Sequence, residues 1–175
     1  MSRVDFTKIR VYRQGGNVLR YHTEMILRPE TVAHHSANVA YICTILEDAT
    51  AEHLYHALIH DIAEQMTGDI PYPFKQQNPA LKSFVDASEE GFLRHNQMYL
   101  SVSPEIHQVV KAADMLDLVL KCVEEMRMGN STVHEMYKTG IAVLSVLPLP
   151  VTPRAKLDSI LQELDAWLDT QTIDK

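Results

Sequence analysis

The chain has 175 residues, of which 46% are hydrophobic, and its formal net charge is −7. This length and apolar content suit one core, so we expect residues 1–175 to form a single domain. The acidic balance argues against a DNA or RNA duplex as a partner, although a local basic pocket can still hold a phosphate. We see neither a secretion leader nor an apolar run of roughly 20 residues, and therefore expect a cytoplasmic protein with no membrane partner.

Helical periodicity runs along most of the chain, while the alternation that marks strands is almost absent. Two cysteines, Cys43 and Cys122, fall within apolar helical patterns and are expected to be core residues. The stretch GDIPYPFKQQNP, residues 68–79, is expected to be irregular. The pattern predicts an all-α fold of about six to seven helices, over residues 3–14, 30–48, 51–66, 78–100, 104–128, 131–146 and 153–170.

The predicted helix 51–66 has an unusual polar face. At about 100° per residue, two groups of side chains gather on opposite sides. One side has Tyr55, Leu58, Ile59, Ile62 and Met66, and the other has His53, His56, His60, Asp61 and Glu64. Solvated faces ordinarily carry Lys and Arg as well, and this face has neither. The adjacent His60 and Asp61 can both reach one ion, and Glu64, one turn on, can hold a water beside it. The pattern indicates a metal site, with a solvent-facing helix as the simpler alternative.

Further ligands of such a site must come from other helices. In TVAHHSANVAYICTIL, residues 31–46, His35 shares a face with apolar residues while His34 points about 100° away, so His35 is the inward histidine. A hydrogen-bonded core histidine is the alternative for His35. In VVKAADMLDLVLKC, residues 109–122, the spacing leaves Asp114 and Asp117 as equal candidates.

The order of these residues resembles a known family. His35, then His60-Asp61, then Asp114 is similar to the H…HD…D order of the HD-domain metal-dependent phosphohydrolases. The segments HDIAEQMTGDIP, VKAAD and KCVEEMRMGN resemble the corresponding segments of bacterial 5'-deoxynucleotidases of the YfbR type. The resemblance covers roughly residues 17–145 and implies a single compact HD-domain helical bundle, in a family that usually forms dimers.

The resemblance also implies a ligand set, and it selects Asp114 over Asp117. A mixed shell of imidazoles and carboxylates suits a borderline divalent transition metal such as Co, Mn, Zn or Fe. The implied ligands of one such ion are His35, His60, Asp61 and Asp114.

Other positions match family residues that act on the substrate. Arg20 and Tyr21 stand where the family has Arg-Trp, which implies a phosphate clamp and a ring that stacks on sugar or base. Glu64 would orient or deprotonate the attacking water, and Asp69 would position substrate or water near the scissile phosphate. The role of His34, at a position where the family has an acid, stays open. No P-loop or nucleophilic Ser or Cys pattern is visible, so direct attack by a metal-activated water is expected.

The implied reaction is hydrolysis of 2'-deoxynucleoside 5'-monophosphates to nucleoside and phosphate. Small phage HD enzymes of the DatZ type, which remove triphosphate from dATP, share the ligand pattern and are the alternative. Lys75 and Lys111 could reach the pocket rim and would hold the extra phosphates of such a substrate. A second alternative is a nucleotide-binding HD protein without turnover, against which Glu64 and Asp69 argue. The segment 131–146 is expected to form a dimer interface or part of the core.

Overall fold

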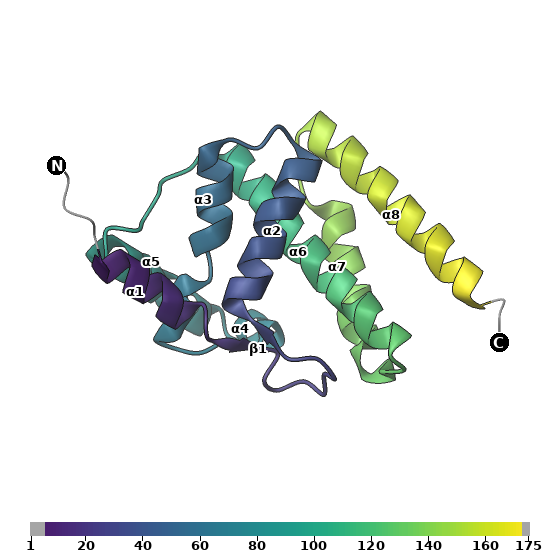
Figure 1. The fold of residues 1–175 in the computed structure, drawn as a ribbon, viewed down its shortest axis with the longest axis horizontal. Helices are drawn as coiled ribbons and strands as arrows, with labels where there is room; N and C mark the ends of the chain where they lie inside the picture. Colours follow the sequence, from purple (N-terminus) through teal and green to yellow (C-terminus); the bar gives the residue numbers. More distant parts are fainter. Residues whose placement is uncertain (1–5, 173–175) are drawn as a thin grey trace.

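The computed structural model describes residues 6–172, with side chains up to residue 168 (Figure 1). Eight α-helices account for most of this part of the chain, which confirms the predicted all-α class. They are α1 Phe6–Gly15, α2 Val32–Leu46, α3 Ala51–Ile59, α4 Tyr72–Gln77, α5 Pro79–His95, α6 Pro104–Arg127, α7 His134–Val146 and α8 Val151–Thr172.

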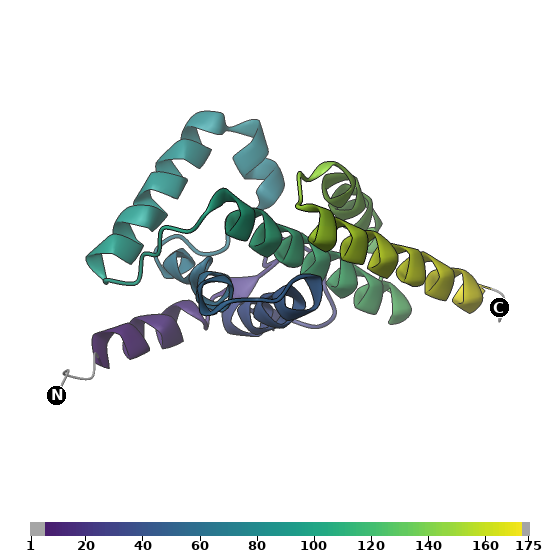
Figure 2. The same ribbon diagram turned by 90° about the horizontal axis from the view of Figure 1, so that it is seen from above.

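The helices α2 and α6 form the centre of the molecule. Helix α3 packs against both of them on one side, while α7 packs on α6 and α8 on α2 (Figures 1 and 2). Apolar side chains from all five helices fill the space between them, as the helical periodicity requires. Cys43 and Cys122 are buried free thiols of this core, as predicted.

A second, smaller core joins α1 to the segment after α3. Its buried members include Val11, Val32 and Ile62. Gly15 makes this contact possible, because a Cβ at that position would lie 2.4 Å from the carbonyl oxygen of Ile62. The end of α1 therefore rests directly on the backbone that follows His60-Asp61.

The predicted helix 51–66 is wrong after Ile59. Helix α3 ends there, His60 and Asp61 turn the chain, and a short 3-10 helix, η1 Ile62–Gln65, follows. The break invalidates the helical wheel for these residues, since Glu64 is 4% exposed while Met66 is 47% exposed. The side chain of His60 accounts for part of the break, because its Nδ1 bonds the carbonyl oxygen of Ala57, 2.7 Å away.

Two further departures from the predicted elements lie in short segments. Helix α4 forms within the stretch predicted to be irregular, with Pro71 as its N-cap residue and Pro73 in its first turn. A two-stranded antiparallel sheet, β1 Leu19–Arg20 and β2 Glu30–Thr31, was not predicted, because two-residue strands leave no alternation to detect. The register places Arg20 opposite Glu30.

The segment 131–146 begins with a 3-10 helix, η2 Ser131–Val133, before α7. Gly140 lets α7 approach α6, since a Cβ there would lie 2.7 Å from Val119. The buried Gly140 and Leu144 give α7 the core role that was one of its two predicted uses. Within residues 6–172, the helices are too short or too polar to cross a membrane.

Candidate metal centre

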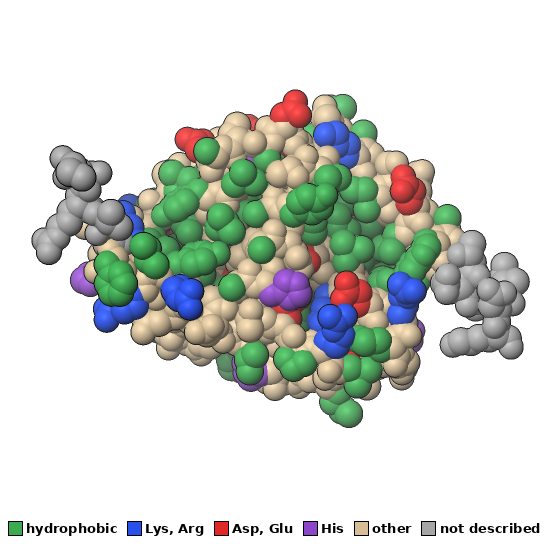
Figure 3. All heavy atoms as spheres, in the orientation of Figure 1, with side chains coloured by type: hydrophobic (Ala, Val, Ile, Leu, Met, Phe, Trp, Pro, Cys, Tyr) green, Lys and Arg blue, Asp and Glu red, His purple; other side chains and the backbone are tan. Residues whose placement is uncertain are grey.

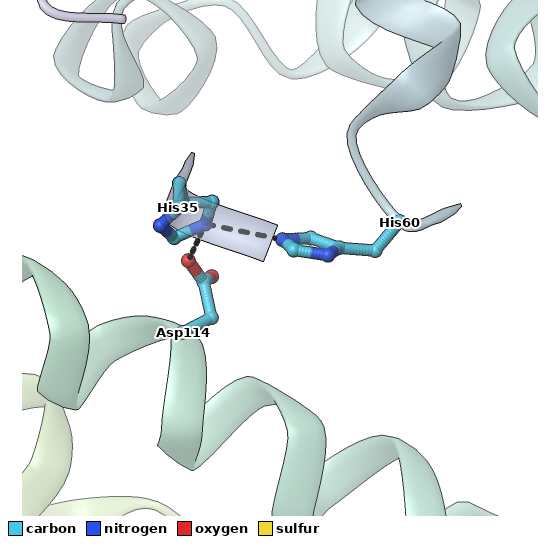
Figure 4. Close-up of side chains that lie close together, drawn as sticks. All are labelled: His35, His60 and Asp114. Carbon is cyan, nitrogen blue, oxygen red and sulfur yellow. Dashed lines mark hydrogen bonds and ion pairs between the residues drawn. The ribbon is translucent and has the colours of Figure 1, made fainter. Parts of the chain in front are cut away.

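Three of the predicted ligands meet where α2, the end of α3 and α6 converge (Figure 4). His35 lies in the first turn of α2, His60 ends α3, and Asp114 lies midway along α6. His35 Nε2 is 3.3 Å from His60 Nε2 and 3.1 Å from the Oδ1 of Asp114. Side chains distant in sequence thus point their donor atoms at one small volume.

Asp61 brings a fourth donor to the same place. Its Oδ2 lies 3.3 Å from His60 Nε2 and 3.6 Å from His35 Nε2. The turn that ends α3 makes this possible, because it lets two adjacent side chains point to one side. We call His35, His60, Asp61 and Asp114 the donor cluster.

The hydrogen bonds of both imidazoles leave their inward nitrogens free to bind a cation. His35 Nδ1 lies 2.7 Å from the Oδ2 of Asp117, and His60 Nδ1 lies 2.7 Å from the carbonyl oxygen of Ala57. An N–H at each Nδ1 satisfies these acceptors and leaves a lone pair on each Nε2. Two facing lone pairs cannot bond each other, whereas a cation between them and the two carboxylates satisfies all four groups. The donor set fits a divalent transition metal.

Without an ion, the donor cluster balances its charge with protons. Burial lowers the pKa of His60, but the neighbouring Asp61 carboxylate outweighs this effect and raises it to about 9. Burial and the charge of Arg20 also lower the pKa of His35. Hydrogen bonds to Asp114 and Asp117 outweigh them, so the pKa of His35 is raised. Burial raises the pKa of Asp61, yet the adjacent imidazoles and Arg20 hold it well below its usual range. A metal must therefore displace protons from the histidines.

Asp114 and Asp117 both contact His35, but at opposite ring nitrogens. Asp114 faces Nε2 within the donor cluster, whereas Asp117 faces Nδ1 on the far side of the ring, near Glu30. A cavity of about 290 Å³ reaches this far side, lined by Glu30, Asp117 and Lys121 among others. The two acids that spacing could not separate thus occupy different chemical environments.

Arg20 extends from β1 to the edge of the donor cluster. Its side chain is buried, with Nη1 2.5 Å from the Oδ2 of Asp61 and Nε 3.6 Å from the Oε2 of Glu30. Its guanidinium carbon lies 5.1 Å from the centre of the Tyr21 ring. The predicted phosphate clamp therefore touches one of the predicted metal ligands.

Tyr21 and Asp69 are joined through the backbone. Tyr21 has a φ of 56°, in the left-handed region, a conformation that costs a residue other than glycine about 1–3 kcal/mol. Its N–H donates to the Oδ2 of Asp69, 2.7 Å away. The contact holds the turn that presents Arg20 and the Tyr21 ring.

Glu64 lies in η1 with its carboxyl group buried. Its Oε2 has no hydrogen-bond partner within the described part of the chain. Burial raises the pKa of Glu64 to about 9, and the negative charges of Asp61 and Asp69 act in the same direction, while Arg20 and Lys75 oppose them. A carboxyl group with a free oxygen thus lies within electrostatic reach of the donor cluster.

The remaining predicted residues lie further out. Lys75 is half-buried on α4, and its charge acts on Glu64 and Glu89. Lys111 is exposed on α6, where its charge acts on His107. His34 is exposed, with Nδ1 3.9 Å from the Oε1 of Glu30.

Glu30 and the carbonyl of Ala57 are parts of the site that were not predicted. Glu30 directly precedes the residue that caps α2, in a segment that looked like ordinary helix. Its partner Arg20 lies across a sheet that the sequence did not reveal. A backbone carbonyl such as that of Ala57 leaves no residue-type signal at all.

Comparison with known proteins decides the family. The model of the family described as 5'-deoxynucleotidase YfbR-like matches residues 14–99 and 90–153. The chain belongs to the YfbR-like 5'-deoxynucleotidase family. A 5'-deoxynucleotidase of Photobacterium profundum is 29% identical to this YfbR-like chain over 170 residues, covering 80% of the chain and 84% of the relative.

Two solved structures share the HD-domain fold with this YfbR-like chain. An HD-domain phosphohydrolase from Listeria innocua has a TM-score of 0.73 at 20% identity, covering 90% of this chain and 86% of that one. The HD phosphohydrolase DatZ of cyanophage S-2L, bound to dA and one catalytic Zn²⁺, has a TM-score of 0.68 at 18% identity, covering 94% and 96%. At these identities the likeness concerns the fold alone.

Proposed function

We propose that the protein hydrolyses 2'-deoxynucleoside 5'-monophosphates to nucleoside and phosphate, using one divalent transition metal. The proposed ligands are His35, His60, Asp61 and Asp114. The observation that carries the proposal is the convergence of these four donors with both Nε2 atoms turned inward. Membership of the YfbR-like 5'-deoxynucleotidase family supports the substrate class.

The cation, when bound, supplies activation of a water and neutralisation of negative charge on the phosphoryl group. Zn²⁺, which the DatZ structure contains, is one candidate for it, together with Co, Mn and Fe. Asp117 and the carbonyl of Ala57 keep the two histidines in the tautomer that binds a cation.

Arg20 is proposed to bind the phosphate. Its guanidinium lies beside Asp61, so a phosphate at the donor cluster is within reach of its planar N–H groups. Charge developing on the phosphoryl oxygens is stabilised by such a preorganised donor. Tyr21, whose ring faces the guanidinium, is placed to stack on sugar or base, and Asp69 holds this arrangement through the Tyr21 N–H.

Glu64 is proposed to accept a proton from the attacking water. Its free oxygen and its position in η1 support this role. Added positive charge at the donor cluster lowers the pKa of a nearby carboxyl group, so the loaded protein would present Glu64 as a carboxylate. A general base of this kind contributes about 10²–10⁴-fold to a rate.

The test is product analysis. Release of phosphate, pyrophosphate and triphosphate is measured for all dNMPs and dNTPs, with Mn, Co, Zn and Mg each added to metal-free protein. We expect phosphate from dNMPs. Triphosphate from dNTPs would assign the DatZ-type reaction instead, and tight nucleotide binding without any product would assign a binding protein.

The proposal extends to a homodimer. Hydrophobic side chains gather over α3 and α2 and on toward α8 (Figure 3), and Tyr41 and Ile45 of α2 are among the exposed ones. Apolar surface of this kind is typical of protein interfaces. Sedimentation equilibrium at several concentrations tests the state, and a monomer at all of them would refute the dimer.

A further inference from the structure

A buried carboxylate near the end of α6 binds the backbone of a distant loop. Glu125 is 0% exposed, and the hydrogen-bond and ion-pair partners of its carboxylate in the described part of the chain are Leu27, Arg28, Lys121 and Asn130, which are not proposed metal ligands. Its Oε2 accepts the N–H of Leu27 at 2.7 Å, and its Oε1 accepts the N–H of Arg28 at 3.0 Å. Hydrogen bonds to an ionised carboxylate are about twice as strong as neutral ones.

Two neighbours bind the carbonyls of the same loop. Asn130 Nδ2 donates to the carbonyl of Met25 at 2.7 Å and to Glu125 at 2.8 Å. Lys121 Nζ donates to the carbonyl of Arg28 at 2.7 Å and lies 3.5 Å from the Oε1 of Glu125. We call Lys121, Glu125 and Asn130 the loop clamp. All three belong to the segment KCVEEMRMGN, which contributes nothing to the donor cluster.

The loop clamp, rather than apolar burial, fixes this loop. Residues 21–29 connect β1 to β2, and the side chains of Met25 and Leu27 are 76% and 57% exposed. A loop with so little buried apolar surface is ordinarily mobile. If the loop moved, the buried carboxylate would lose two of its hydrogen bonds, those from Leu27 and Arg28. Loss of hydrogen bonds to a buried charge is costly.

Both ends of the loop lie at the proposed active site. Arg20 at one end contacts Asp61, and Glu30 at the other end lies 3.6 Å from Arg20 across the two-residue sheet. Tyr21, the first loop residue, has the left-handed backbone conformation that Asp69 holds. A shift of the loop would therefore move the guanidinium relative to the donor cluster.

We infer that Glu125 is a positioning residue for substrate binding, which acts through the loop 21–29 to hold Arg20 at the phosphate site. The inference rests on the proposed function only for the role of Arg20. Lys121 and Asn130 support it by fixing the carbonyls of the same loop. Displacement of a substrate-binding group by about 1 Å costs on the order of 10²-fold in rate, so a remote contact of this kind has a measurable effect.

The first experiment compares Glu125→Gln with Glu124→Gln, an adjacent exposed acid on the same turn. An amide in place of the carboxylate can accept through one atom only, so one loop N–H loses its partner. We expect kcat/KM of Glu125→Gln to fall by about 10–10²-fold, through kcat as well as KM, with metal affinity within about twofold of the parent. Hydrogen exchange of residues 21–29 should rise, and that of α2 should not. Unchanged loop exchange, or a loss of metal, would overturn the inference.

A double-substitution cycle separates positioning from general destabilisation. If Glu125 acts through Arg20, Glu125→Gln should cost less than about twofold in kcat/KM once Arg20→Gln is present. Equal losses in both backgrounds would mean that Glu125 stabilises the fold and does not position Arg20.

A second variant covers the case in which Glu125→Gln does not fold. Asn130→Ala removes the bonds of Asn130 to the carbonyl of Met25 and to Glu125. It leaves the Thr132 hydroxyl on that carbonyl and both loop N–H groups on the carboxylate. We expect a smaller rise in exchange over residues 21–29 and a smaller fall in kcat/KM than in Glu125→Gln. If the parent protein hydrolyses no nucleotide, the proposed function has failed, and the exchange measurement still decides whether the loop clamp holds the loop.

Discussion

Arg20 Nη1 lies 2.5 Å from the Oδ2 of Asp61, so the proposed phosphate-binding cation and a proposed metal ligand are in direct contact. The contact gives Arg20 two opposite effects. Its charge favours a phosphate near the donor cluster, and the same charge opposes a second cation there. Substrate binding and metal binding should therefore respond to Arg20 with opposite signs.

Replacing Arg20 by Ala tests this opposition. We expect kcat/KM to fall by about 10²–10³-fold, the range for loss of one preorganised charge-stabilising donor. Affinity for the divalent metal, measured by calorimetry on metal-free protein, should rise, because a repelling charge is gone. Arg13→Ala, on the exposed surface of α1, serves as the control. A parallel loss of metal would show that Arg20 supports the donor cluster instead.

The two acids that contact His35 give a second prediction. Asp114→Asn should lose the metal, because a carboxylate that faces the inward nitrogen is removed. Asp117→Asn should retain one metal per chain with about 10–100-fold weaker binding, the usual effect of losing the partner that orients a ligating histidine. Metal content of the purified variants and titration with a chelator measure both. Full occupancy in Asp114→Asn would make Asp117 the ligand.

The different positions of Asp114 and Asp117 around His35 could not be predicted from helical periodicity. Both lie on the side of α6 that faces α2, one turn apart, and both touch the same ring. Their separation depends on which edge of His35 each one meets, and helical periodicity has no access to that. The resemblance selected Asp114, and the geometry of the ring provides a physical account of that choice.

The fold shows a similar division between local and long-range information. The all-α class and most helices follow from hydrophobic periodicity, which is local. The break after Ile59 depends on a side-chain bond and on packing of α1 against η1, so a helical wheel extended through it placed Glu64 and Met66 wrongly. The hydrogen bond between Glu125 and Leu27 joins residues 98 positions apart, and no local pattern in either segment predicts it.

Glu64 provides a third prediction. Glu64→Gln should keep metal content and nucleotide affinity while kcat falls by about 10²-fold or more, the scale for loss of a general base. Single-turnover kinetics with excess protein separate chemistry from binding. Glu52→Gln, an exposed acid in the first turn of α3, is the matched control. If metal and rate are lost together, Glu64 is a ligand.

The raised pKa of His60 predicts a pH dependence of stability. In the metal-free protein this pKa is about 9, above the ordinary value of 6.5. Protonated His60 therefore stabilises the fold fully below pH 6.5, and this contribution is lost as the pH rises through about 9. Thermal unfolding of chelator-treated protein should show Tm falling between pH 7 and pH 9, and less so in His60→Gln.

With metal present, the stabilising effect of the ion should grow between pH 7 and pH 9, opposite in direction to the loss of stability in the metal-free protein. Protons and metal compete for His60 and His35, so higher pH strengthens metal binding and the metal stabilises only the folded chain. The gain in Tm on adding one equivalent of metal should therefore increase from pH 7 to pH 9. A gain that is independent of pH would mean that neither histidine binds the ion.

Lys75 and Lys111 discriminate a monophosphate substrate from a triphosphate. One Arg complements the roughly two charges of a monophosphate, whereas a triphosphate carries about four and needs further cations along its outer phosphates. Lys75 on α4 is half-buried, and its charge lowers the pKa of Glu64, so it is the nearer of the two to the proposed site. Lys111 is exposed, and its charge lowers the pKa of His107. For a dNMP enzyme, Lys111→Ala should be neutral and Lys75→Ala should change kcat/KM by less than about threefold, in contrast to Arg20→Ala. Steady-state kinetics with each dNMP and dNTP measure this, and a large defect confined to dNTPs in either lysine variant, with triphosphate as product, would assign the triphosphohydrolase reaction.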